Sequence, residues 1–283
     1  PCRRPKPPAD SMIFEAARAK LNLALHVTGR REDGYHLLDS LVAFADIGDR
    51  IALMPGPLSL KIDGPFADDL SAGNNLCLDA ARLAGGAAQI TLTKILPVAS
   101  GVGGGSADAA AVLRGLARMG HPLPADPWRL GADVPVCIAS VPARMAGIGE
   151  KVTPLPALPP VPLVLVNPGF PVATPQVFSA LTCRENSPLP PIPAFADRAA
   201  LIGWLRGTRN DLETPARTIA PVIGTVLRTL DATGAAFTRM SGSGATCFGL
   251  FDSVARARAS VETLKQHGWW AVVSELAPRP APG

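Results

Sequence analysis

The fold of this chain is decided by Pro97-Val98-Ala99-Ser100-Gly101-Val102-Gly103-Gly104-Gly105-Ser106-Ala107, a glycine-rich loop between two regular segments. Residues 89–94, before the loop, alternate polar and apolar side chains, which predicts a strand. Residues 107–119, after the loop, are rich in alanine and predict a helix that ends at Gly120. Glycines let backbone N–H groups approach an anion, and a helix N-terminus adds about half a positive charge. The loop therefore predicts a phosphate site, in which the Ser106 hydroxyl either caps the helix or contacts a phosphate oxygen or Mg²⁺.

Other common phosphate-binding motifs do not fit this loop. A Walker A loop requires Gly-Lys, which occurs nowhere in the chain, and Ser106 replaces the third glycine of a Rossmann fingerprint. The DFG and HRD triplets of protein kinases are also absent. A tight turn whose glycines serve packing alone remains an alternative, although three consecutive glycines directly before a helix favour the phosphate site.

Composition excludes several classes of protein. The chain has 283 residues, 47% of them hydrophobic, and a net charge of only +4 without a block of like charges, which argues against a nucleic-acid partner. No apolar run is long enough to span a bilayer, and residues 1–5 lack the apolar core of a secretory signal. The five cysteines form no C-x-x-C pair, which argues against zinc and for a reducing compartment. We expect a cytoplasmic protein, a monomer or weak homodimer, with no membrane partner.

The remaining pattern predicts a mixed α+β chain with two domains. The proline-rich residues 153–162 are expected to connect an N-terminal domain, residues 10–155, to a C-terminal domain, residues 162–276. Residues 1–11 and the tail after residue 276 are expected to be loose. Strands are predicted at 19–27, 50–53, 58–62, 163–167, 245–251 and 270–274, with a further ordered run at 35–45. Helices are predicted at 75–83, 126–130 with Asp126 as its N-cap, 197–206, 215–231 and 253–267.

Two charged residues lie in apolar surroundings. Asp133 lies in Gly131-Ala132-Asp133-Val134-Pro135-Val136, where an isolated buried charge would be costly, so it needs a partner. Taken alone, an N-cap or a structural salt bridge explains Asp133 as well as a catalytic role does. Lys20 lies on the first strand between apolar residues, and a lysine whose ammonium reaches the surface is the alternative to a functional one.

Five segments together resemble the GHMP small-molecule kinases. They are the glycine loop, Ala19-Lys20-Leu21-Asn22-Leu23 with Gly29-Arg30-Arg31-Glu32-Asp33-Gly34-Tyr35-His36, Leu130-Gly131-Ala132-Asp133-Val134-Pro135, Asn210-Asp211-Leu212-Glu213, and Met240-Ser241-Gly242-Ser243-Gly244-Ala245. The resemblance runs from about residue 16 to residue 275 and is strongest to the branch that phosphorylates CDP-methylerythritol in the non-mevalonate (MEP) isoprenoid pathway. Departures are mild: Val102 replaces a usual leucine, Ala107 a frequent serine, and Ala99-Ser100 a glycine-rich pair.

The resemblance implies a fold and a set of roles. The fold would be a two-domain GHMP kinase, with an N-terminal half like domain 2 of ribosomal protein S5, a ferredoxin-like C-terminal half, and the active site in the cleft between them. ATP would be bound by Pro97, Val98, Ala99, Ser100, Gly101, Val102, Gly103, Gly104, Gly105, Ser106 and Ala107. Asp133 would be the general base and Lys20 its catalytic partner. The substrate would contact Asn22, Tyr35, His36, Phe178, Ser241 and Gly242, with Tyr35, His36 and Phe178 around the cytosine.

The implied reaction transfers the γ-phosphoryl group of ATP to the C2 hydroxyl of CDP-methylerythritol. ATP and Mg²⁺ are the implied cofactors, with the Mg²⁺ ligands unknown. Several of the residues also allow a purely structural role: a surface turn for His36, core packing for Phe178, and a plain turn for Ser241-Gly242-Ser243-Gly244. Two alternatives to the function stay open as well, a homoserine or mevalonate type of GHMP kinase and a non-catalytic nucleotide-binding protein with the same fold.

Overall fold

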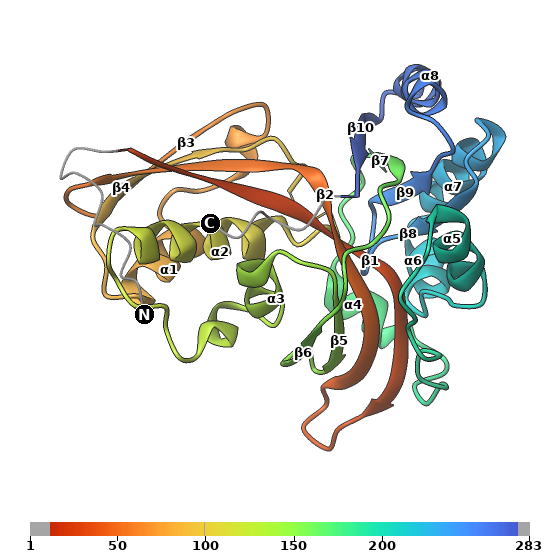
Figure 1. The fold of residues 1–283 in the computed structure, drawn as a ribbon, viewed down its shortest axis with the longest axis horizontal. Helices are drawn as coiled ribbons and strands as arrows, with labels where there is room; N and C mark the ends of the chain where they lie inside the picture. Colours follow the sequence, from red (N-terminus) through yellow and green to blue (C-terminus); the bar gives the residue numbers. More distant parts are fainter. Residues whose placement is uncertain (1–11, 99, 277–283) are drawn as a thin grey trace. The chain divides into compact units, whose positions relative to one another are not determined.

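The structure is a computed structural model that describes residues 12–98 and 100–276, so the predictions for residues 1–11, Ala99 and the tail lie outside the described residues. The chain forms two compact units. Figure 1 draws the ribbon with colours that follow the sequence from the N-terminus to the C-terminus. Unit 1 contains the chain up to Ala19, Gly48–Val98 and Gly103–Ala139. Unit 2 contains Lys20–Ile47, the short segment that ends at Val102, and the chain from Ser140 onward. These packing units do not test the predicted domain division, which stays a prediction.

Two long strands contribute to both units. They are β1 (Ile13–Arg30) and β2 (His36–Pro55), which pair with each other. The predicted strand at 50–53 and the ordered run at 35–45 are therefore parts of one strand. Gly48 allows β2 to continue past β1, because a Cβ at this position would collide with the backbone of Ala17.

Unit 1 consists of a sheet and its helices. The Arg50–Pro55 part of β2 pairs antiparallel with β4 (Ala88–Thr93), which pairs in parallel with β3 (Ser59–Asp63). The helical elements are η1 (Ala67–Asp69), α1 (Leu76–Leu83), α2 (Gly104–Arg118), η2 (Pro127–Leu130) and α3 (Val134–Ala139). Asn75 caps α1 by accepting a hydrogen bond from the Cys77 N–H. Asp126 is the N-cap of η2 as predicted, but its side chain makes no capping hydrogen bond and the element is a 3₁₀ turn.

Unit 2 contains a second, four-stranded sheet. Its strands are β7 (Pro162–Asn167), β8 (Phe237–Met240), β9 (Cys247–Leu250) and β10 (Trp270–Glu275), in the order β10-β7-β9-β8 and all antiparallel. Helices connect β7 to β8 and β9 to β10, which is the βαββαβ arrangement of a ferredoxin-like layer. The predicted ferredoxin-like half is therefore present, with α7 (Val222–Ala232) and α8 (Val254–Lys265) packed against the sheet.

The rest of unit 2 surrounds β1 and β2. The Leu38–Val42 part of β2 pairs with β5 (Ala143–Gly147), which pairs with β6 (Lys151–Pro154). Short helices α4 (Thr174–Ser179), α5 (Arg198–Arg206) and α6 (Glu213–Ile219) follow. The predicted single helix at 215–231 is two helices, α6 and α7. The chain leaves the helix at Ala220 because Pro221 disfavours helical geometry in the residue before it.

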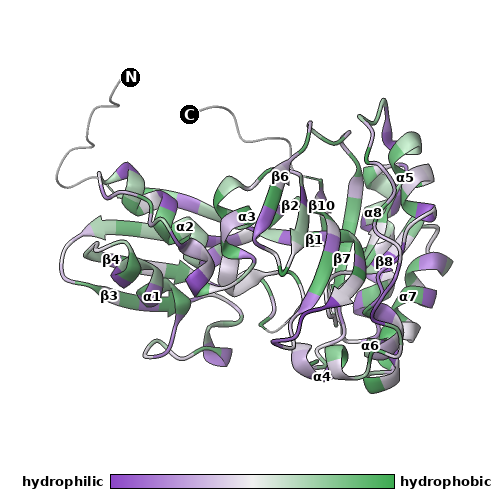
Figure 2. Cartoon of the chain, turned by 90° about the horizontal axis from the view of Figure 1, so that it is seen from below, coloured by the Kyte–Doolittle hydropathy of each residue, from purple (hydrophilic) through white to green (hydrophobic). Residues whose placement is uncertain are grey.

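Apolar side chains form the interior of each unit. Green predominates along β1, β2 and β7 in Figure 2, which matches their runs of buried positions. Within the described ranges, no helix combines the length and the apolar character that crossing a membrane requires.

Candidate active site

The glycine loop leads into α2 earlier than expected. The helix begins at Gly104, three residues before the predicted start, so Ser106 lies within its first turn rather than at the cap. Gly103 is the N-cap, with φ 64° and ψ 24°, a left-handed conformation that glycine adopts without strain. No side chain caps this end of α2. A helix of 15 residues therefore begins with small residues at a positively polarised terminus, as a phosphate site requires.

Gly101 lies against the Ser-Gly loop, residues 241–244, within unit 2. A Cβ on Gly101 would lie 2.6 Å from the carbonyl oxygen of Gly244 and 2.7 Å from that of Ser241, and its φ is 75°. The Ser241 hydroxyl donates a hydrogen bond to the Gly101 carbonyl at 3.1 Å. Only glycine fits this position, so the close approach of the two loops depends on it.

Lys20 and Asn22 lie beside the same loops. Lys20 is 4% exposed, and its backbone N–H donates to the Val102 carbonyl at 2.9 Å. The Asn22 N–H donates to the Ser241 hydroxyl at 3.1 Å, and its side-chain amide donates to Ser40 at 2.8 Å. Unit 2 therefore brings together Lys20, Asn22, Ser241 and the Gly101-Val102 part of the glycine loop.

Asp133 lies in unit 1, directly before α3. Its carbonyl accepts a hydrogen bond from the Cys137 N–H at 3.1 Å, which forms the first turn of that helix. A Cβ on Gly131, two residues earlier, would lie 3.5 Å from the Ser106 hydroxyl. The segment that carries Asp133 therefore packs beside the first turn of α2, as the predicted roles of both segments require.

A buried charge cluster beside α2 has no counterpart among the residues predicted from the sequence. The Lys94 ammonium donates to Asp49 Oδ2 at 2.5 Å and to Asp108 Oδ2 at 2.9 Å, and all three side chains are at most 4% exposed. Asp49 Oδ1 also accepts from the N–H groups of Ile95 and Leu96, directly before the glycine loop. We call Lys94, Asp49 and Asp108 the ion triad; it ties β2, the start of the loop and α2 together.

The ion triad also explains one glycine of the loop. A Cβ on Gly104 would lie 3.1 Å from the Lys94 ammonium, so a larger residue there would press on the triad. Burial disfavours the Lys94 ammonium, but the two carboxylates outweigh burial and raise its pKa. Burial raises the pKa of Asp108 to about 7 despite the nearby Lys94, and its Oδ1 has no hydrogen-bond partner among the described residues. Side chains of β4 alternate between the buried and the exposed face, and Leu92 is buried. The same alternation places Lys94, two residues later, on the buried face, so the sequence pattern could have identified Lys94 as a buried lysine.

The aromatic residues expected at the cytosine lie in unit 2. The rings of His36 and Phe178 are stacked, with centroids 4.8 Å apart and an interplanar angle of 24°, whereas Tyr35 is 61% exposed. His36 Nε2 is buried and has no hydrogen-bond partner in the part of the chain that the structure describes. Burial lowers the pKa of His36, helped by Arg30 and Arg184, so the ring is neutral at pH 7. A neutral, unpaired ring nitrogen beside an aromatic face suits a base with polar edges.

The Asn210-Asp211-Leu212-Glu213 segment holds the Ser-Gly loop in place. The Asn210 side chain donates to the carbonyls of Met240 and Gly242 at 2.9 and 2.8 Å, and Glu213 accepts from the Met240 N–H at 3.1 Å. Asp211 in turn accepts from the Val27 N–H of β1 at 2.7 Å. This segment therefore links the Ser-Gly loop to the strand that carries Lys20 and Asn22.

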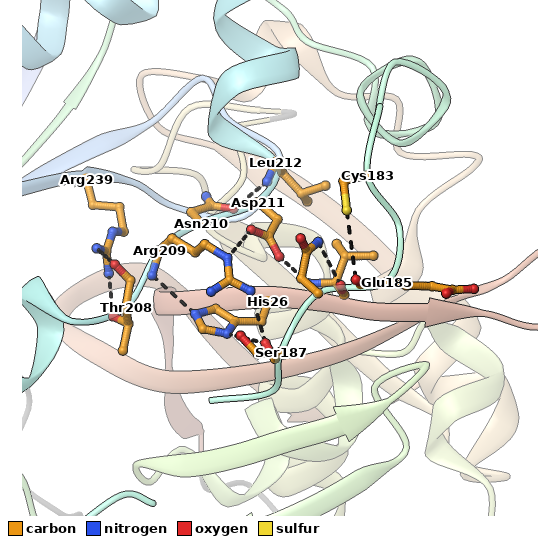
Figure 3. A network of polar contacts seen from close by, with 12 residues as sticks. His26, Cys183, Glu185, Ser187, Thr208, Arg209, Asn210, Asp211, Leu212 and Arg239 are labelled. Carbon is orange, nitrogen blue, oxygen red and sulfur yellow. Dashed lines mark hydrogen bonds and ion pairs between the residues drawn. The ribbon is translucent and has the colours of Figure 1, made fainter. Parts of the chain in front are cut away.

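His26 anchors the same link (Figure 3). Its Nε2 accepts from the Arg209 N–H at 3.2 Å, so its Nδ1 carries the proton donated to the Ser187 carbonyl at 2.9 Å. The ring is 1% exposed, and burial is the main cause of its lowered pKa. Protonation of Nε2 would break the hydrogen bond from Arg209, so this anchor requires neutral His26.

No dedicated metal cage is present among the described residues, since no group of three or more His, Cys, Asp or Glu side chains could hold an ion.

Comparison with known proteins defines the class. Residues 74–143 match the GHMP kinases N terminal domain, and residues 192–268 match the GHMP kinases C terminal domain. The chain therefore belongs to the GHMP kinase family, and the family and fold expected from the glycine loop are confirmed.

Named relatives point to one branch of this family. A 4-diphosphocytidyl-2-C-methyl-D-erythritol kinase of Paracoccus denitrificans is 59% identical over 268 residues, which cover 93% of this chain and 97% of the relative. A kinase of the same name from Ruegeria pomeroyi is 54% identical, covering 92% and 98%. The crystal structure of a 4-(cytidine 5'-diphospho)-2C-methyl-D-erythritol kinase matches with a TM-score of 0.76 at 36% identity, covering 94% and 99%. A homoserine kinase from Cytophaga hutchinsonii shares the fold, with a TM-score of 0.66 at 16% identity, 95% of each chain being covered.

Proposed function

We propose that this protein transfers the γ-phosphoryl group of ATP to the C2 hydroxyl of 4-diphosphocytidyl-2-C-methyl-D-erythritol. Relatives at 50–59% identity over at least nine-tenths of the chain carry the name of this activity. The observation that carries the proposal is the glycine loop, whose left-handed Gly101 and Gly103 lead into the N-terminus of α2. A cytoplasmic location and a monomeric or weakly dimeric state are parts of the same proposal.

Phosphoryl transfer requires positioning and neutralisation of charge more than covalent help from the protein. In our proposal, residues 97–107 hold the triphosphate through backbone N–H groups and the dipole of α2. Mg²⁺, when bound, neutralises phosphate oxygens, with the Ser106 hydroxyl as its candidate protein ligand. The start of the loop is held by the ion triad, which orders the backbone before nucleotide arrives.

We propose Asp133 as the general base and Lys20 as its partner. Asp133 Oδ accepts the proton of the acceptor hydroxyl as that oxygen attacks the γ-phosphorus, and the bond to the β-phosphate oxygen breaks. The Lys20 ammonium keeps the carboxylate ionised and offsets charge that develops on the transferred group. One contact within each unit supports these roles: in unit 2 the Lys20 backbone N–H donates a hydrogen bond to the Val102 carbonyl, and in unit 1 the Asp133 segment packs beside Ser106.

We propose that His36 and Phe178 bind the cytosine, with Tyr35 beside them and Asn22 toward the erythritol. The buried, unpaired Nε2 of His36 supports this assignment, because a polar atom without a partner gains from a ligand hydrogen bond. The Ser-Gly loop, whose Gly242 carbonyl accepts from Asn210, is assigned to the substrate diphosphate through Ser241 and Gly242 in the same proposal.

The test is release of ADP in a coupled assay with CDP-methylerythritol, homoserine and mevalonate as acceptors. Turnover with the cytidylylated alcohol alone supports the proposal, whereas turnover only with homoserine or mevalonate would assign the chain to that other type of GHMP kinase. Nucleotide binding without turnover of any acceptor would identify a non-catalytic protein. Within this assay, Asp133→Asn should lower kcat by about 10²–10⁴-fold with little change in ATP affinity.

A further inference from the structure

A separate cavity lies in unit 2, between α6 and α7. Its volume is about 700 Å³, and it is lined by residues 214, 217, 218, 221, 222, 224, 225 and 228. Two of these residues are arginines, three are threonines and none is acidic. None of them belongs to the glycine loop, the Ser-Gly loop or the residues proposed to bind substrate.

Two guanidinium groups converge in this cavity over Gly224. A Cβ on that buried glycine would lie 3.2 Å from Arg217 Nε, 3.4 Å from Arg217 Nη2 and 3.5 Å from Arg228 Nη1. Gly224 lies in the first turn of α7, whose positively polarised end faces the same residues. Two like charges near a helix N-terminus repel each other, so an anion bound between them would be attracted by both guanidinium groups and by the helix dipole.

Among the described residues, the carboxylate that pairs with these two arginines is that of Glu213, on Arg217. Glu213 Oε1 is 3.8 Å from Arg217 Nη1, which is longer than a hydrogen bond, and its other oxygen accepts from the Met240 N–H. The Arg228 guanidinium donates to the neutral hydroxyl of Thr225 at 3.1 Å. The Glu213 carboxylate therefore forms a long ion pair with Arg217, and both arginines line the cavity.

The chemistry of the cavity selects a phosphate-bearing anion. Guanidinium groups bind phosphate through two parallel hydrogen bonds, and the threonine hydroxyls offer further donors. A volume of about 700 Å³ exceeds what one inorganic phosphate needs and is typical of small-molecule sites. We propose that Arg217 and Arg228 form a second anion site, separate from the proposed active site, for the phosphate or diphosphate group of a small metabolite.

The test is a calorimetric titration of the full chain with inorganic diphosphate, with and without saturating CDP and a saturating non-hydrolysable ATP analogue, which together occupy the proposed substrate and nucleotide positions. We expect one diphosphate to bind in the presence of both. Arg217→Gln and Arg228→Gln should each weaken that binding about tenfold or more, as loss of a charge-assisted hydrogen bond predicts. If no diphosphate binds while both are bound, the proposed site does not exist.

Two further variants separate the site from general charge effects. Arg258→Gln, on the exposed face of α8, removes the same charge elsewhere in unit 2 and should leave the binding unchanged. Gly224→Ala keeps every charge but displaces the guanidinium groups, so it should weaken the binding. Equal weakening by Arg258→Gln and by the cavity variants would overturn the proposal. ADP release with CDP-methylerythritol, measured without diphosphate, reports on the proposed active site alone.

Discussion

Replacing Lys94 by methionine should destabilise unit 1 strongly. Methionine keeps the length of the side chain but removes the ammonium that lies between Asp49 and Asp108. Asp49 would then be a buried carboxylate without a counter-charge, beside a partly ionised Asp108. Removing one partner of a buried ion pair costs about 3–5 kcal/mol of folding free energy. The loss of folding free energy in Lys94→Met should therefore lie within this range or above it.

The two carboxylates should differ sharply in importance. Asp108 has a pKa raised to about 7 and one oxygen without a hydrogen bond, so much of its charge is already lost at neutral pH. Asp108→Asn should therefore lower the free energy of unfolding by only about 1 kcal/mol or less, because Lys94 and Asp49 remain as an ion pair without net charge. Asp49→Asn should cost more, since Asp49 also accepts the N–H groups of Ile95 and Leu96.

Urea unfolding followed by circular dichroism measures these differences. In the double variant Lys94→Met, Asp108→Asn, part of the loss should be recovered, because one of the two uncompensated charges is gone. The reasoning is refuted if Lys94→Met is no less stable than Asp108→Asn, or if the double variant is the least stable of the three.

Three further outcomes are expected. His36→Ala should raise the KM for CDP-methylerythritol about tenfold or more, because it removes the proposed cytosine contact, while the KM for ATP stays constant. Steady-state kinetics measures both values, and an equal rise in both would argue against a cytosine contact. Gly101→Ala should lower kcat/KM and stability together, because the added methyl meets two carbonyl oxygens within 2.7 Å, and unchanged kinetics and melting would contradict the close approach. His26 has a lowered pKa in the folded state, so its stabilising contribution is complete above pH 6.5 and is lost as the pH falls below that value. In urea unfolding between pH 5 and 8, His26→Gln should lose this part of the pH dependence, and an identical slope in both proteins would exclude the anchor.

The fold was predictable where local pattern and tertiary structure agree. Strict alternation identified β4, and the pattern of residues 75–83 identified α1. The prediction of a single helix at 215–231 was wrong because the apolar periodicity continues across Pro221, where the structure divides the segment into α6 and α7. α4 was missed because its six residues are too few to show a helical period.

The motifs of the candidate site were predictable from the sequence, but the buried contacts that hold them in place were not. The glycine loop is recognisable from its local pattern, whereas the roles of Lys20 and Asp133 were implied only by the resemblance to the GHMP kinases. The ion triad joins residues that are distant in sequence, and no local pattern pairs a lysine with two aspartates across a fold. Arg217 and Arg228 likewise look like ordinary exposed residues until their guanidinium groups are seen to converge over Gly224.

We propose that Asp133 is the base when this chain moves a phosphoryl group from ATP to one alcohol. ³¹P NMR of a reaction with ATP and CDP-methylerythritol observes both products of that transfer. We predict one new phosphomonoester, on C2, for each ADP formed, and loss of that signal in Asp133→Asn. Formation of ADP without a phosphomonoester, or an undiminished rate in the variant, would contradict the account.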